Sequence, residues 1–278
     1  MRPITGAKLA AFATLVFLLV TSGAAMAQGN PQQLVKEMVY NELHANKHPN
    51  YWMYTDKDTE SGTTKVKRVV QTHECWFRWE MSINGQPLTP AQEQQQRDKI
   101  NKLVTDEQAR QKNRAEINHD SQQATNLMKM LPDAFLYTED GEQNGNIRLK
   151  FRPNPQFSPP TRPAKVFHNM EGTLLINKRE KRLAGISGTL MSDVDFGWGI
   201  LGKLYKGGTF KVQQTQVGPD DWEVTLLDVH MRGRVLFFHT IHEQQRESES
   251  DFQRVPDGIT LQQAAALAEH GNLNASAQ

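Results

Sequence analysis

The chain has 278 residues, of which only 37% are hydrophobic. Its formal net charge is +1, so it carries no polybasic field of the kind that binds nucleic acid. After the first 27 residues, no apolar run approaches the roughly 18 residues that a membrane-spanning helix needs. Cys75 is the single cysteine, which excludes a disulfide within the chain; its alternatives are a reactive thiol and a buried small hydrophobe, and its surroundings favour the second.

The first 27 residues predict an export signal. Arg2 and Lys8 form a positive start, residues 9–20 are nearly all apolar, and Ala25-Met26-Ala27 supplies the small residues of a cleavage site. Cleavage after Ala27 would leave a mature chain that begins at Gln28 in the periplasm. An uncleaved membrane anchor is the alternative, and the short apolar run argues against it.

Residues 31 to 45 predict an amphipathic helix. Its apolar stripe consists of Leu34, Val35, Met38, Val39 and Leu43.

Three strands are predicted next, over residues 51–59, 63–72 and 74–83. Ser61-Gly62 and Asn84-Gly85 are turn signals between and after them. The three strands therefore form an antiparallel meander.

Residues 89 to 131 predict a long or broken helix of unusual polarity. Thr89 and Pro90 are a good helix start, and apolar residues are sparse between Val104 and Ala124. We expect a solvated arm that is anchored at both ends. A partner-binding coiled coil is the alternative, but a sustained apolar seam is missing.

The remainder is rich in strands. Five prolines between residues 152 and 163 predict an extended connector or lid, and the glycine-rich stretch 193–208 predicts an irregular or short helical connection. A turn is expected at Arg232-Gly233. The predicted strands are 134–138, 147–151, 166–177, 182–191, 209–217, 221–231 and 234–242, and a closing helix covers 261–270.

About ten strands joined by short turns must pair antiparallel. The predicted fold class is α+β: a large curled antiparallel sheet, a half-barrel, wrapped around the N-terminal helix with a long polar helical insertion. We expect the signal at 1–27, a single curled-sheet domain at 28–255 and a C-terminal helix and tail at 256–278.

The candidate catalytic and metal groups have ordinary structural explanations. His239 and His242 stand three apart in a strand and point to opposite faces, while His230 precedes the expected turn. The acid pairs Asp193/Asp195 and Asp220/Asp221 lie in turn-like segments, where aspartate bonds its own backbone. We therefore predict no catalytic residue, no metal site and no cofactor, although a scattered hydrolase site is a third alternative.

Aromatic residues on the strands are either core or the lining of an apolar cavity. Phe77 and Trp79 share one face of a strand, as do Trp222, Val224 and Leu226. A curled sheet closed by a helix would enclose a pocket for an acyl chain. The predicted lining residues are Phe77, Trp79, Trp198, Trp222 and Phe237.

The plan of the chain resembles the superfamily of the periplasmic lipoprotein carrier LolA, which includes LppX-like proteins. The resemblance rests on the export signal, the N-terminal helix, the segments Met170-Glu-Gly-Thr-Leu-Leu-Ile-Asn and Arg182-Leu-Ala-Gly-Ile-Ser-Gly, Trp222-Glu-Val-Thr and a last strand that reaches Phe252. It covers residues 31–85 and 134–254 and implies a half-open barrel that holds lipid or acyl chains. The segment 193–202 also resembles exported proteins of Gram-negative bacteria, from which no functional residue can be transferred.

The sequence thus predicts a non-enzymatic periplasmic carrier or sensor that binds a lipid or the acyl chain of a lipoprotein. The alternative is a cell-envelope scaffold with a filled core that binds a protein partner through residues 89–131.

Overall fold

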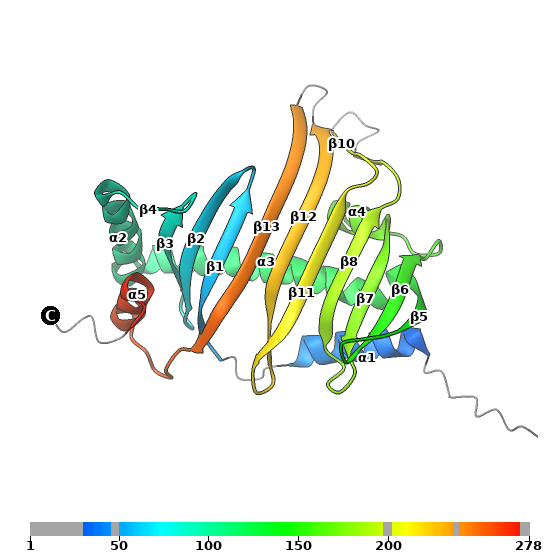
Figure 1. The fold of residues 1–278 in the computed structure, drawn as a ribbon, viewed down its shortest axis with the longest axis horizontal. Coiled ribbons are helices and arrows are strands. Elements are labelled where there is room, and N and C mark those ends of the chain that lie inside the picture. Colours follow the sequence, from blue (N-terminus) through cyan, green and yellow to red (C-terminus); the bar gives the residue numbers. More distant parts are fainter. Residues whose placement is uncertain (1–29, 46–49, 197–201, 236–238, 273–278) are drawn as a thin grey trace, which may run out of the picture.

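The computed structural model describes residues 30–45, 50–196, 202–235 and 239–272. Thirteen strands form one open antiparallel sheet with the order β4-β3-β2-β1-β13-β12-β11-β8-β7-β6-β5, and β9 and β10 attach beside β12 (Figure 1). Five helices pack on the sheet. The predicted class, a large antiparallel sheet with an N-terminal helix and a polar helical insertion, is confirmed.

The elements have the following bounds: α1 Pro31–His44, β1 Trp52–Glu60, β2 Thr63–Gln71, β3 Trp76–Ile83, β4 Gln86–Pro87, α2 Pro90–Thr105, α3 Glu107–Ala134, β5 Phe135–Gln143, β6 Asn146–Pro153, α4 Arg162–His168, β7 Met170–Asn177, β8 Leu183–Leu190, β9 Val194–Phe196, β10 Gly202–Leu204, β11 Thr209–Gly218, β12 Asp221–Val235, β13 His239–Arg254 and α5 Leu261–His270.

Helix α1 packs on one face of the sheet, which we call the inner face. Alternate side chains of β5 to β8 point to this face because strand residues alternate between the two sides. They meet the buried stripe of α1 and the last turn of α3 in the largest core. Its fully buried members include Val35 and Met38 of α1, Ala134 of α3, and Leu149 and Leu174 of the sheet.

Helices α2 and α5 cover the opposite, outer face at the β2–β3 end of the sheet. Met53, Val70 and Phe77 are cross-strand neighbours and therefore share this face. They form a second core with Ile100 of α2 and Leu267 of α5. The insertion thus begins on the outer face with α2 and reaches the inner core with α3, with a break between the two helices at Asp106.

The insertion is the polar arm that the sequence predicts. Thr89 closes a reciprocal capping box with Gln92 at the start of α2, and Pro90 occupies the first turn. Asp106 ends α2 and accepts hydrogen bonds from the backbone of Gln108 and Ala109, so it also caps α3.

Three predicted segments are wrong. The glycine-rich stretch 193–208, predicted as an irregular or short helical connection, contains the short strands β9 and β10, which pair with each other. The connector after β6 contains helix α4, which is capped by Thr161 and has Pro163 in its first turn. The sequence instead predicts an extended connector there, followed by the start of a strand.

The turn predicted at Arg232-Gly233 is strand, since Gly233 pairs with Ile241. Gly233 is required there because a Cβ atom would lie 2.4 Å from the carbonyl oxygen of Lys203 on β10.

Candidate functional site

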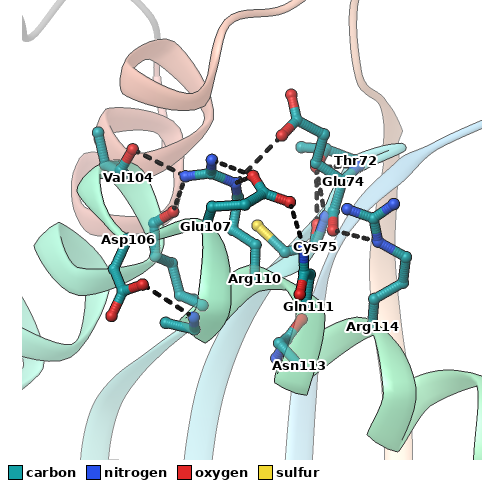
Figure 2. Close-up of polar contacts among 12 residues, drawn as sticks. Thr72, Glu74, Cys75, Val104, Asp106, Glu107, Arg110, Gln111, Asn113 and Arg114 are labelled. Atoms are coloured by element: carbon teal, nitrogen blue, oxygen red, sulfur yellow. Dashed lines mark hydrogen bonds and ion pairs between the residues drawn. The ribbon is translucent and has the colours of Figure 1, made fainter.

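Helix α3 crosses the inner face of the sheet (Figure 1). At its N-terminal end, polar contacts join it to the segment that leads into β3 (Figure 2). The Arg110 Nε lies 3.1 Å from a carboxylate oxygen of Glu74, and the Arg114 Nε donates to the Glu74 carbonyl at 3.2 Å. The Asn113 side chain accepts from the backbone N–H of Trp76 at 2.9 Å. These contacts fix the helix at the edge of the sheet.

The C-terminal end of α3 is held by the inner core. Leu131 is buried there, and its carbonyl accepts a 2.8 Å hydrogen bond from the Tyr137 hydroxyl. Between the two anchors, residues 115–124 are exposed except for Ile117, which is half-buried. Ten consecutive residues span every side of an α-helix. The middle of α3 is therefore largely solvated, with Ile117 as the half-buried residue of this segment.

A row of apolar side chains lies on the inner face of β11 and β12. Val212 pairs with Ile186 of the inner core, and Leu227 pairs with Val212 across the next strand boundary, so all three share that face. The row is half-buried, and Phe210, Val212 and Met231 also pack in part against the inner core. We call it the apolar strip; it consists of Phe210, Val212, Leu227, Val229 and Met231.

Carboxylates occupy the inner face beside this strip. Leu227 pairs with Glu247 of β13, and Glu247 pairs with Asp58 of β1, while Asp56 pairs with Glu249. Two pairs of like charges thus lie directly opposite each other, an arrangement that destabilises a sheet. We call Asp56, Asp58, Glu223, Glu247 and Glu249 the acidic cluster; Glu223 belongs to it because its charge raises the pKa of Glu249.

One lysine partly neutralises the cluster. The Lys67 Nζ lies 3.2 Å from the Oδ2 atoms of both Asp56 and Asp58. Asp56 is only 4% exposed. Within the described residues, the Oδ1 atoms of Asp56 and Asp58 are buried without a hydrogen-bond partner, which is costly for a carboxylate.

Burial also perturbs the protonation of the cluster. Desolvation, followed by the charges of neighbouring carboxylates, raises the pKa of Glu249 to about 8. Desolvation and Asp221 raise the pKa of Glu223 to about 7. Burial likewise raises the pKa values of Glu247 and Asp56, against the lowering effect of Lys67. Protons therefore bind to this face in the neutral pH range.

The structure separates the predicted lining residues. Phe77 and Trp79 are buried in the outer core beneath α2 and α5. Trp222 lines an open hollow of about 350 Å³ with mostly polar neighbours and donates a 2.8 Å hydrogen bond to Glu180. Trp198 and Phe237 lie outside the described residues. A binding role for these five residues stays a prediction, and the described three do not line one cavity.

A register shift near Thr225 also changes the expected face of β12. Leu226 pairs with Gln213, whereas Val224 pairs with the next residue along β11, Gln214. The shared face predicted for Trp222, Val224 and Leu226 is therefore interrupted by a bulge.

The other candidate groups have structural partners. Cys75 is buried in the outer core, where desolvation raises the pKa of its thiol. His230 is 2.8 Å from Asp228 and pairs across the sheet with Gln244 rather than with a residue near His239.

The two predicted acid pairs also have partners. Lys203 lies within 3.4 Å of both Asp193 and Asp195. Asp221 is buried and accepts a hydrogen bond from Asn50.

The described residues contain no group of three or more His, Cys, Asp or Glu side chains suited to hold a metal ion. None of their helices has both the length and the apolar character of a membrane span.

Comparison with known proteins gives one distant likeness. No protein-family model matches the sequence, and no curated protein matches it significantly. The fold is similar to a crystal structure of a DUF1329 family protein from Desulfovibrio piger, with 10% sequence identity and a TM-score of 0.28 over 88% of this chain and 99% of that chain. This likeness assigns no specific function.

Proposed function

We propose that the protein is a non-enzymatic carrier or sensor that holds a lipid, or the acyl chain of a lipoprotein, on the inner face beneath α3. One observation carries the proposal: a half-buried apolar strip on β11 and β12 lies on the face that α3 crosses with a largely solvated middle. Apolar side chains that stay partly open to solvent are a common feature of ligand sites.

The arrangement of α3 suits a ligand that enters from the side. The helix is anchored through Arg110 at one end and Leu131 at the other, and the exposed residues lie between these anchors. Each methylene removed from water contributes about 0.8 kcal/mol, so a long acyl chain supplies substantial binding energy without directed bonds.

The sequence plan supports the same proposal. The export signal predicted at residues 1–27 supports a periplasmic location for the mature protein, and the likeness of the sequence plan to the LolA superfamily suggests acyl chains as ligands.

A charge in the apolar strip should abolish retention of the ligand. We expect Leu227→Asp to weaken binding of a fluorescent acyl lipid at least tenfold, because the carboxylate would have to be desolvated against the chain. Fluorescence titration of the purified mature protein measures this.

The matched control is Val66→Asp, which places the same change on a half-buried valine of the outer face. Val229→Thr gives a second, nearly isosteric test if Leu227→Asp fails to fold. Wild-type affinity in a folded Leu227→Asp protein would overturn the assignment of the strip.

The second candidate is an envelope scaffold that binds a protein through the arm at residues 89–131. The exposure of α3 between residues 115 and 124, where Ile117 is the one half-buried residue, favours it. A protein that takes up no acyl lipid at all would make this the better description.

A further inference from the structure

The apolar strip and the acidic cluster are parts of one surface. Leu227 is the direct cross-strand partner of Glu247, whose other neighbour is Asp58. A chain that lies along the strip therefore contacts the edge of the cluster. Any charge on Glu247 faces the ligand.

The charged groups around the cluster leave an excess of negative charge. On β2, Lys67 forms ion pairs with Asp56 and Asp58. Lys65, also on β2, is the cross-strand partner of Asp58, and its Nζ lies 3.7 Å from a carboxylate oxygen of Glu80 on β3. The remaining groups that face the cluster are Tyr54 on β1, Arg78 on β3, and Asp221 and Arg182 beside Glu223. The five carboxyl groups of the cluster, with Glu80 and Asp221 beside them, thus face three nearby cations on β2 and β3 and Arg182 at the far end.

We propose that proton uptake by the acidic cluster controls occupancy of the inner face. Neutral carboxyl groups admit an acyl chain, and ionised groups expel it. This inference rests on the proposed function and specifies how that site is regulated.

The direction follows from desolvation. A chain on the strip removes water from Glu247 and its neighbours and so favours their neutral forms. Binding is then coupled to proton uptake, and coupling to one proton changes the affinity tenfold for each pH unit across the titration range. The pKa values in the ligand-free protein, about 8 for Glu249 and about 7 for Glu223, mark the lower end of this range, because the ligand raises both further. Affinity rises as the pH falls.

The test uses the purified mature protein and lysophosphatidylcholine with a fluorescent acyl chain, a probe whose own charge is constant between pH 6 and pH 8.5. We expect the wild-type protein to bind at least tenfold more tightly at pH 6 than at pH 8.5. The double variant Glu247→Gln/Glu249→Gln should lose most of this difference, because amides do not titrate and Glu223 is then the one remaining cluster residue with a pKa near neutrality. Glu139→Gln, an exposed residue of β5, is the matched control and should keep the wild-type pH profile.

The outcomes separate the two proposals. Binding that is independent of pH, or tighter at pH 8.5, overturns proton control and leaves the carrier intact. A double variant with the wild-type pH profile also overturns proton control. Absence of binding at every pH overturns the proposed function and this inference with it.

Discussion

Replacing Phe135 by alanine should lower the free energy of unfolding by about 3–5 kcal/mol, the range for truncation of a buried phenylalanine. Phe135 is 0% exposed and stands where α3 passes into β5. Its ring meets those of Phe151 at 4.8 Å and Phe167 at 5.2 Å, both edge-on, so it joins β5, β6 and α4. Truncation leaves a cavity at the point where three elements meet and where the C-terminal anchor of α3 is formed.

Chemical denaturation at equilibrium measures the loss. Tyr40→Ala on α1 is the control, because Tyr40 is 61% exposed and a surface substitution should change the free energy by no more than about 0.5 kcal/mol. A loss below 1 kcal/mol for Phe135→Ala would contradict the described core.

Replacing Glu42 by alanine should lower the free energy of unfolding by about 3–5 kcal/mol, because it leaves a buried guanidinium without its counter-charge. Arg182 is 8% exposed, and its Nε donates to Glu42 at 2.8 Å. The same carboxylate accepts a 2.7 Å hydrogen bond from the backbone N–H of Leu183. Glu42 thus ties α1 to the start of β8.

A double variant distinguishes pairing from simple packing. Glu42→Leu with Arg182→Met removes both charges and should recover most of the stability, since a buried ion pair replaced by apolar residues is often neutral. Equal destabilisation in Glu42→Ala and in the double variant would show that the charge pair does not carry the contact.

Helix ends were the most predictable part of the fold. Thr89 and Pro90 mark the start of α2, Pro31 marks the start of α1, and the closing helix runs over the predicted residues 261–270. Each signal is local, because a cap or a first-turn proline satisfies the orphan N–H groups of its own helix.

Features that depend on distant segments were not predictable in the same way. Gly233 has the composition of a turn, yet β12 continues through it because β10 passes too close for a side chain. The prolines after β6 indicate a connector, although Pro163 is also compatible with the first turn of α4.

The acidic cluster was missed because it exists only in the register of the sheet. Asp56 and Glu249 lie in separate polar stretches that are typical of solvated strands, and no local spacing shows that they are neighbours. The signal available was weak: alternating acids in both Tyr54-Thr-Asp-Lys-Asp and Glu247-Ser-Glu place like charges on one face of each strand. Natural proteins keep such unfavourable arrangements mainly at functional sites, which is consistent with a role in ligand control.

The central claim is that the inner face holds an acyl chain, and its most direct test is mass spectrometry of the lipids extracted from protein purified from the periplasm without detergent. We predict one acyl lipid per protein in the wild type and a several-fold lower content in Leu227→Asp, with Val66→Asp unchanged. A folded wild-type protein that carries no lipid and takes up no fluorescent acyl lipid would contradict the claim.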